Sequence, residues 1–270
     1  MTAAHAELPA RRPAAARHGF AYATRVRVTR WMIFVGLLLA WEIYGQTFAN
    51  PRLISPPSLL LHALFTEILA DSRIVGAIGQ AFWEVIVSYV ASIVLGLAIG
   101  LAVGWSNFGR RSFFPIVLLL YAIPQVILLP LFVLIFGIGP ACKIAFGISH
   151  GVFPIIVNVI AGMRNVNPLY LRSAASLGGS PLDVARHVYF PHMVPSLFTG
   201  LRLGMTMTLL GVILAELYVS TAGIGYWTKV YAETFDPAPL LALIAVLALM
   251  AILLNSLVRV AERRFTRWRS

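Results

Sequence analysis

Apolar stretches long enough to cross a membrane recur along the chain from residue 31 onward. A spanning helix needs about 20 mostly apolar residues, because the hydrocarbon layer is about 30 Å thick and each helical residue rises about 1.5 Å. Six stretches approach or meet this length: residues 31–48, 74–105, 113–136, 144–163, 197–219 and 239–258. The third and fourth are separated only by Gly137-Ile138-Gly139-Pro140, a sequence typical of a turn. The pattern therefore predicts an all-α integral membrane protein with about six transmembrane helices.

The composition agrees with a membrane protein and removes several other classes. Hydrophobic residues make up 59% of the 270 residues and charged residues 11%, and the mean hydropathy is +0.84. A soluble globular domain has about 45–50% apolar and about 25% charged residues. The single cysteine, Cys142, excludes an internal disulfide and a thiolate cage for zinc or an iron–sulfur cluster. We therefore expect a chain that folds within the bilayer without an internal disulfide.

The basic residues behind the formal net charge of +11 lie in short runs beside the apolar stretches. If the N-terminus is inside, the inner segments hold 17 Lys and Arg residues. The outer segments hold four, namely Arg52, Arg73, Lys143 and Lys229. Cytoplasmic loops carry the excess of Lys and Arg in membrane proteins, so this split predicts six spans with both ends in the cytoplasm.

This topology divides the chain into four parts. We expect residues 1–30 to form a flexible basic cytoplasmic tail, since no apolar stretch there could be a cleavable signal peptide. Residues 31–74 hold the first span and an outer interfacial segment, and residues 75–260 hold the main transmembrane domain. Residues 261–270 form a basic cytoplasmic end.

The outer interfacial segment follows the first span. Pro56 and Pro57 stop any helix that continues from before, and Ser58 is a suitable cap for a new one. The short amphipathic stretch that follows suits the outer membrane interface. It is either a wall of an outer vestibule or a connector that rests on the bilayer.

Two residue types in the spans carry structural information. Gly96, Gly100 and Gly104 recur every four residues, which predicts a bare helical face where another helix packs closely. Each interior proline removes one backbone hydrogen bond and weakens the helix at that point. Such prolines are either moving hinges or kinks in a rigid bundle. Five prolines lie in or beside the third and fourth spans: Pro115, Pro124, Pro130, Pro140 and Pro154.

Three carboxylates fall at spanning depth, and each needs a partner, a proton or water because a charge in the bilayer costs at least about 2.5–3.5 kcal/mol. Glu216 lies near the outer end of the fifth span and is a candidate for a cavity-lining or gating group, or for a bond to a neighbouring helix. Glu42 and Glu84 fit helix-to-helix bonding better, with Glu84 kept as a second pathway candidate. His150 and Asn158 either face a polar lumen or are satisfied core groups.

No enzyme motif is present. The chain lacks a zinc-binding His-Glu-x-x-His helix, a Gly-x-Ser-x-Gly elbow and an aspartate pair within a span. A phosphate loop needs a lysine after glycine, and the only lysines, Lys143 and Lys229, have no glycine-rich setting. We therefore expect no catalytic residue, metal ligand or cofactor site in this chain. Energy for active transport would come from a partner or an ion gradient.

The longest cytoplasmic connection, residues 164–196, predicts two short amphipathic helices on either side of a glycine break. Gly178 and Gly179 permit a sharp turn, and Pro191 is expected to end the second helix. Such a helical pair outside the membrane is well shaped to dock into a groove of another protein.

This connection resembles the cytoplasmic signature of type I ABC importer permeases: Glu-Ala-Ala, three residues, glycine, nine residues, an aliphatic residue, two residues, proline. With the signature glycine on Gly178, Val188 takes the aliphatic position and Pro191 the proline position. Arg172, Ser173 and Ala174 stand at the Glu-Ala-Ala positions. Arg172 stands where the family has a glutamate. The docking role is still expected, but any salt bridge that the family glutamate makes is not.

The similarity continues along residues 50–270, in order. It covers Ile54-Ser55-Pro56-Pro57-Ser58, Ile123-Pro124, Leu129-Pro130-Leu131, Phe136-Gly137-Ile138-Gly139, Lys143-Ile144, Ala215-Glu216, Gly223-Ile224-Gly225-Tyr226 and the basic C-terminal end. The chain resembles the branch that carries nitrate, sulfonates, taurine, bicarbonate or pyrimidine precursors of thiamine. Residues 75–260 would then form the ABC type-1 transmembrane domain of an inner-membrane protein.

The resemblance implies a mechanism of alternating access. Two copies would pair around the pathway, and a separate ATPase dimer, which binds ATP and Mg, would seat the loop through Ala174, Leu177, Gly178, Gly179 and Asp183. A solute-binding protein would deliver a small organic or oxyanionic solute at the outer face. Two alternatives compete: an ion-driven secondary carrier with Glu84 or Glu216 as proton carriers, and a channel or scaffold without energy coupling.

Overall fold

The computed structural model describes residues 15–265, and all regular structure within that range is helical. The helices are α1 (Ala15–Thr47), α2 (Pro57–Ala63), α3 (Ser72–Gly104), α4 (Asn107–Ala122), α5 (Leu129–Phe136), α6 (Pro140–Arg164), α7 (Pro168–Ser176), α8 (Pro181–Val184), α9 (Phe190–Val219), α10 (Ile224–Glu233) and α11 (Pro237–Phe265). Three short turns complete them: the π-helical η1 (Leu64–Ile68) and η3 (Ala185–Tyr189), and the 3-10 helical η2 (Gln125–Leu128).

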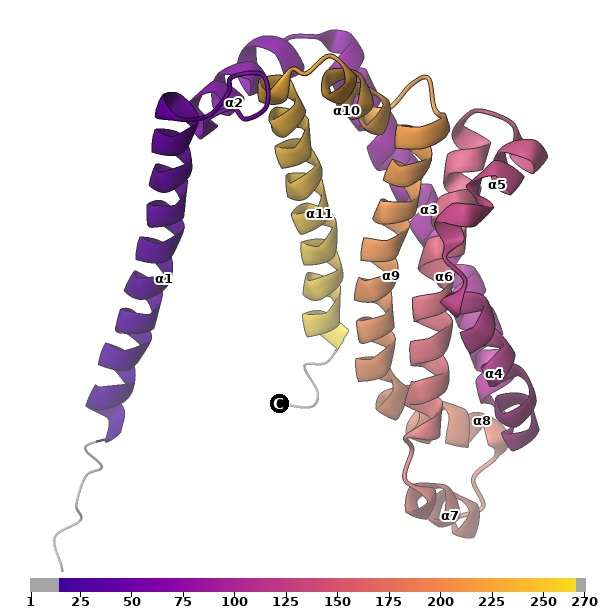
Figure 1. Ribbon diagram of the computed structural model, residues 1–270. Coiled ribbons are helices and arrows are strands. Elements are labelled where there is room, and N and C mark those ends of the chain that lie inside the picture. The colour runs from indigo at the N-terminus through magenta and orange to yellow at the C-terminus, as the bar shows by residue number, and fades with distance from the viewer. Residues whose placement is uncertain (1–14, 266–270) are drawn as a thin grey trace, which may run out of the picture.

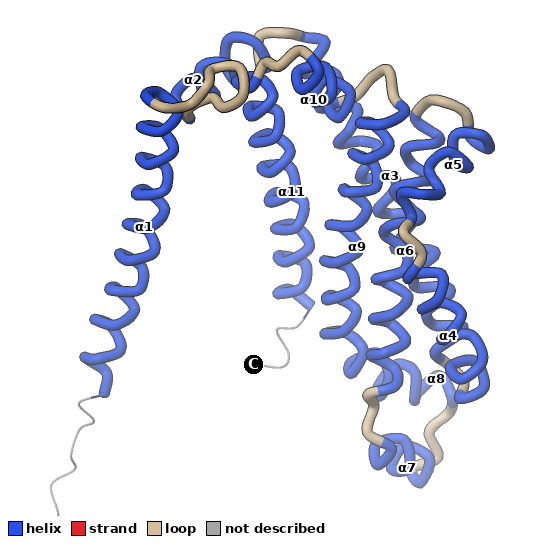
Figure 2. The backbone as a smooth tube through the Cα atoms, viewed as in Figure 1, coloured by secondary structure: helices blue, strands red, loops and turns tan. Residues whose placement is uncertain are grey.

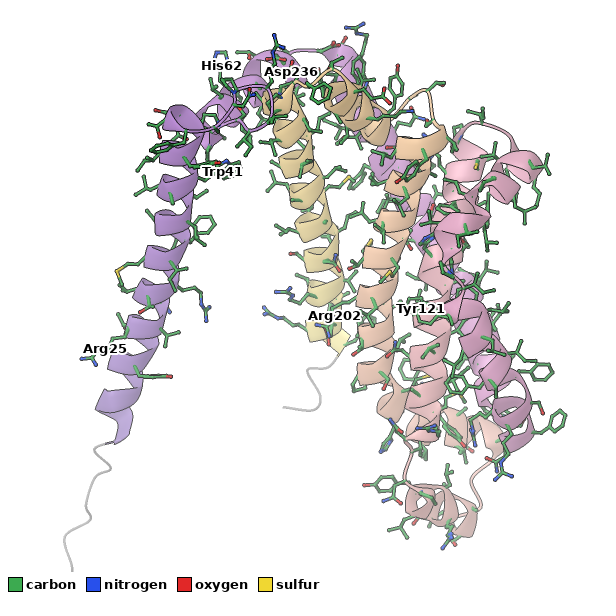
Figure 3. The ribbon with its side chains drawn as sticks, viewed as in Figure 1. Arg25, Trp41, His62, Tyr121, Arg202 and Asp236 are labelled. Carbon is green, nitrogen blue, oxygen red and sulfur yellow. The ribbon has the colours of Figure 1, made fainter. Side chains whose placement is uncertain are left out.

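The long helices form a bundle in which α6 packs along α3 and α9, and α11 packs against α9 (Figure 1). Near the middle of α9 the Arg202 side chain (Figure 3) reaches α11, where its Nη1 lies 3.5 Å from Glu262 Oε2. Helix α1 stands apart from the bundle and is joined to it through α2. The short helices α2 and α10 lie at one end of the bundle and α7 and α8 at the other, as the loops in Figure 2 show.

Within residues 15–265, four helices are long and apolar enough to cross a membrane: α3, α6, the continuous helix Pro181–Val219 and α11. The prediction of a continuous third span is wrong, because α4 and the segment Gln125–Phe136 are bent by 80°. They count together as at most a fifth span. Pro124 explains the break: it lacks an amide hydrogen, and it disfavours helical dihedrals at Ile123, which is extended (φ −67°, ψ 127°).

Helix α1 contains the first predicted span and, with 33 residues, is long enough to cross a membrane, but it is not among the helices that are apolar enough. Its apolar part is short and contains Glu42 and Gln46. The expectation of a flexible tail is wrong from Ala15 onward, because α1 begins there. Residues 1–14 and 266–270 of the predicted basic ends lie outside the described residues.

The start of α2 corrects the expected role of Ser58. Its side chain does not cap the helix; its backbone N and its Oγ donate to Glu42 of α1, at 3.0 and 2.5 Å. The Glu42 carboxylate therefore satisfies an amide in the first turn of α2, where the partial positive charge of the helix end favours an anion. Bonding between helices, as expected for Glu42, is confirmed.

One face of α3 carries small or polar residues at every fourth position, and this face meets α6. A Cβ added to Gly96, Gly100 or Gly104 would lie 2.6–2.8 Å from side-chain atoms of α6, which no real packing permits. The partners are Ile155, Val159 and Met163, respectively. Further along the same face, Ser88 Oγ donates to Ile144 O at 3.2 Å. The glycines therefore let the two backbones approach closely enough for hydrogen bonds between the helices.

Pro191 does not end the second loop helix, contrary to the expectation. It lies in the first turn of α9, and α8, η3 and α9 form one continuous helix, Pro181–Val219. A proline is tolerated in a first helical turn, and the wider π-turn of η3 precedes it at Ala185–Tyr189.

Candidate functional site: a projecting helical loop and a buried ion cluster

The loop between α6 and α9 has well-defined helix ends. Asn167 caps α7, because its side chain accepts a hydrogen bond from Leu169 N at 2.9 Å. Gly178 ends it with a positive φ of 72°, which glycine adopts without strain. Gly178 N donates to Ala175 O and Gly179 N to Ala174 O, the paired bonds of a Schellman motif. The predicted glycine break is therefore a specific, hydrogen-bonded turn.

The second half of the loop begins with a capping box. Ser180 Oγ accepts from Asp183 N at 3.3 Å, and Asp183 Oδ2 accepts from Ser180 N at 3.1 Å. Hydrogen bonds from the Ser180 side chain and backbone hold the pKa of the Asp183 carboxyl below its ordinary value. Asp183 thus serves local helix formation, while Val188, in η3, and Pro191 lie within the helix that continues into the bundle.

The loop projects beyond the bundle (Figure 1). It exposes apolar side chains. Leu177 and Leu182, on either side of the glycine turn, are 87% and 76% exposed. The α7 side chains Arg172 and Ser173 are also exposed, and Ala174 is half-buried. Large apolar groups beside charged ones at such a projection are typical of a surface that another protein covers.

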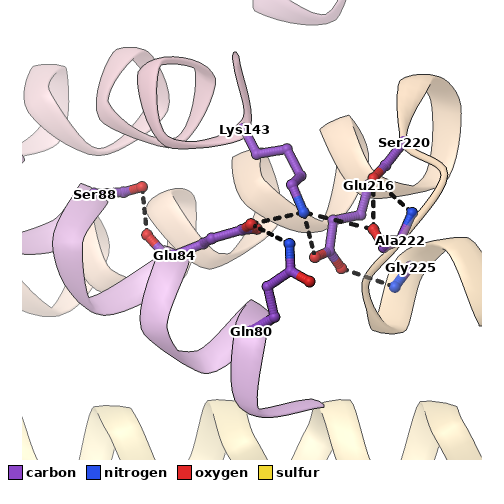
Figure 4. A network of polar contacts seen from close by, with 8 residues as sticks. All are labelled: Gln80, Glu84, Ser88, Lys143, Glu216, Ser220, Ala222 and Gly225. Atoms are coloured by element: carbon purple, nitrogen blue, oxygen red, sulfur yellow. Dashed lines mark hydrogen bonds and ion pairs between the residues drawn. The ribbon is translucent and has the colours of Figure 1, made fainter. Parts of the chain in front are cut away.

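A buried ion cluster lies near the opposite end of the bundle (Figure 4). Lys143 Nζ of α6 lies 2.7 Å from Glu84 Oε1 of α3 and 3.3 Å from Glu216 Oε1 of α9. All three side chains are buried. The structure thus brings together the two carboxylates that the sequence singled out and adds the cation between them.

Two backbone contacts join this cluster to the turn between α9 and α10. Glu216 Oε2 accepts from Gly225 N at 2.9 Å, and Lys143 Nζ donates to Ala222 O at 3.5 Å. Gly223 has φ 111°, and a Cβ there would lie 2.0 Å from Glu216 Oε1. The cluster therefore fixes three bundle helices and the outer turn in one arrangement.

The cluster holds two carboxylates against one ammonium. Glu84 Oε1 also accepts from Gln80 Nε2 at 2.9 Å, whereas Glu84 Oε2 has no hydrogen-bond partner within residues 15–265. Removing one member of a buried ion pair costs about 3–5 kcal/mol, because it leaves an uncompensated buried charge.

The sequence-based prediction misplaced Lys143. We expected it in an outer connection, but it lies in the first turn of α6 and is buried. A signal was available: Lys143 is one of only two lysines and directly precedes an apolar span that needs a cation for the carboxylates of its neighbours.

His150 and Asn158 both contact α9. His150 Nδ1 donates to Phe146 O at 3.0 Å, and the side chain lies against Gly211. Asn158 Nδ2 donates to Pro154 O at 2.8 Å, and its Cβ lies against Gly200. One nitrogen of each side chain is therefore bonded to a carbonyl of its own helix.

Comparison with known proteins identifies the family to which this chain belongs. The family described as "binding-protein-dependent transport system inner membrane component" matches residues 92–267, more than half of the chain. The chain belongs to this family. It is therefore a multi-pass inner-membrane permease of an ABC importer, and the family match does not favour a secondary carrier.

Two relatives and one solved structure illustrate the relationship. The permease is 30% identical to the taurine transport system permease protein TauC of Escherichia coli, over 86% of each chain. It is 27% identical to the formylaminopyrimidine transport permease protein ThiX of Halalkalibacterium halodurans, over 88% of this chain and 94% of the relative. An inward-facing structure of the MetNI methionine ABC transporter shares the fold, with a TM-score of 0.60 at 18% identity over 73% of this chain and 96% of the other.

Proposed function

We propose that this permease forms the solute pathway as a homodimer and is driven by a separate ATPase that docks on the loop between α6 and α9. The observation that carries the proposal is the pair of exposed leucines, Leu177 and Leu182, on a rigid glycine turn outside the bundle. In this proposal the partner binds ATP and Mg, and this chain has no catalytic residue and no cofactor.

The coupling is mechanical. The continuous helix Pro181–Val219 begins in the loop and carries Glu216 in its last turn. A displacement of the loop by the ATPase would therefore be transmitted along this one helix to the ion cluster. We propose that this motion opens and closes the outer end of the pathway, with Glu84 and Glu216 as gate elements through Lys143.

The outer surface has a different role in the proposal. Helices α2 and α10 lie at the end of the bundle opposite the loop, where a solute-binding protein would deliver its cargo (Figure 1). The solute is proposed to be a small organic or oxyanionic molecule. The names of the relatives support this class: taurine, formylaminopyrimidine and aliphatic sulfonates. His150 and Asn158 are proposed as helix contacts next to this pathway.

The experiment is an affinity purification of the tagged permease from its own membranes, followed by mass spectrometry. The wild type should retain a P-loop ATPase in stoichiometric amounts, and Gly178→Trp should lose it while still inserting. Gly137→Trp is the matched control, because Gly137 has nearly the same φ (71° against 72°) and the same open surroundings at the other end of the bundle. Retention of the ATPase by Gly178→Trp, or its loss from both variants, would contradict docking at this loop.

A further inference from the structure

The break between α4 and α5 leaves irregular backbone at the middle of the bundle. Helix α4 ends at Ala122, and the extended residue Ile123 and Pro124 precede η2. Gln125 contacts the central part of α6: its Oε1 lies 2.9 Å from Ser149 Oγ and shares the hydroxyl proton with Phe146 O, which lies 2.8 Å from the same Oγ. Figure 2 shows this loop about half-way between the two ends of the bundle.

Irregular backbone at this depth cannot face lipid. The last carbonyls of a helix and the first amides of the next have no partners in their own helices. Hydrocarbon offers them no hydrogen bonds, so such backbone occurs at membrane depth only where protein buries it or where it lines a water-filled space.

Within residues 15–265 the helices leave the break partly exposed. Tyr121, in the last turn of α4, stacks on Phe153 of α6, with ring centroids 5.8 Å apart (Figure 3). Beyond it the chain turns outward, and Ile123 and Val126 are 42% and 43% exposed. Gln125 is half-buried, and with Oε1 held by Ser149 its Nε2 has no hydrogen-bond partner within residues 15–265.

We propose that this break lines the water-filled part of the solute pathway and that Gln125 presents its amide N–H groups to the passing solute. The inference rests on the proposed function and names a contact within it. A carboxamide N–H donates, so the matching group on the solute is an acceptor oxygen, such as that of a sulfonate, carboxylate or carbonyl. This chemistry lies within the organic and oxyanionic class proposed above.

The experiment measures whether water reaches this position. The only native cysteine, Cys142, is buried, so the wild type serves as the blank for a positively charged methanethiosulfonate reagent. Gln125→Cys in membranes should react at least about tenfold faster than Leu134→Cys, because hydrocarbon excludes a fixed charge. Leu134 is the matched control: it lies on α5 just beyond the break and is 82% exposed, but is apolar and within a regular helix.

Val126→Cys is the second variant, so the result does not depend on the loss of the Gln125 hydrogen bond to Ser149. Rapid reaction at both positions supports the proposal. Reaction at both positions as slow as at Leu134→Cys would overturn it. This measurement needs neither ATP nor a bound ATPase, so its failure is distinguishable from failure of docking at the α6–α9 loop.

Discussion

Lys143 of α6 and Glu84 of α3 form an ion pair of 2.7 Å in which both side chains are buried. Glu216 of α9 completes the cluster from a third helix. Neither carboxylate has another cation within reach among the described residues. The outer half of the bundle therefore depends on a single ammonium group.

Lys143→Met should lower the free energy of unfolding by about 3–5 kcal/mol, because it leaves two buried carboxylates without their cation. Thermal unfolding of the purified permease measures the effect. Lys229→Met is the control: Lys229 lies 3.8 Å from Glu233 in a solvent-exposed pair, which contributes about 0–1 kcal/mol. Equal stability of the two variants would contradict a structural role for the cluster.

Gly223→Ala should destabilise the turn between α9 and α10 more than Gly137→Ala destabilises its own turn. Both glycines combine a positive φ with an extended ψ, a region almost confined to glycine, so each alanine stores about 1–3 kcal/mol of backbone strain. Only at Gly223 would the new Cβ also collide with Glu216, at 2.0 Å from Oε1. Thermal unfolding of the two variants gives the comparison, and a larger loss for Gly137→Ala would contradict the contact.

Gly100→Ala should cost about 1–3 kcal/mol through overpacking, since its Cβ would lie 2.8 Å from Val159. The double variant Gly100→Ala with Val159→Ala should lose less than the sum of the two single losses, because the second change removes Val159 Cγ1, although Val159 Cβ, also 2.8 Å away, remains. Gly79→Ala, with open space around it, is the matched control and should be close to neutral. Additive losses in the double variant would show that the two residues do not meet.

The capping box at the start of α8 gives a pH dependence of defined sign. The folded-state pKa of Asp183 lies below its ordinary value, so its stabilisation is present at neutral pH. It is lost as the pH falls through that lowered pKa. Asp183→Asn imitates the protonated state and should speed hydrogen exchange of the amides around Ser180 at neutral pH. Unchanged exchange would mean that the box does not hold the helix start.

Much of the architecture follows from local sequence pattern. Gly96, Gly100 and Gly104 identify the packed face of α3 because helical periodicity alone aligns them. The glycine turn of the loop follows from the need for a positive φ at Gly178. Both features depend only on residues close together in the chain.

The remaining features depend on distant contacts or on the exact position of a residue in its helix. Pro124 breaks a span, whereas Pro191 lies within a continuous helix. The difference is one of position, because only Pro191 lies in the first turn after a π-turn. The partnership of Lys143 with Glu84 and Glu216 joins residues from three helices. Composition predicts that the carboxylates need a cation, but tertiary packing decides which one.

The most direct test of the central claim is a photo-crosslink from the loop in native membranes. Leu177→p-benzoylphenylalanine should form one major adduct, with a P-loop ATPase, because Leu177 projects from the glycine turn. The same substitution at Phe235, an exposed residue between α10 and α11 at the opposite end, should give no such adduct. An adduct with the ATPase only from position 235, or none from position 177, would contradict the account.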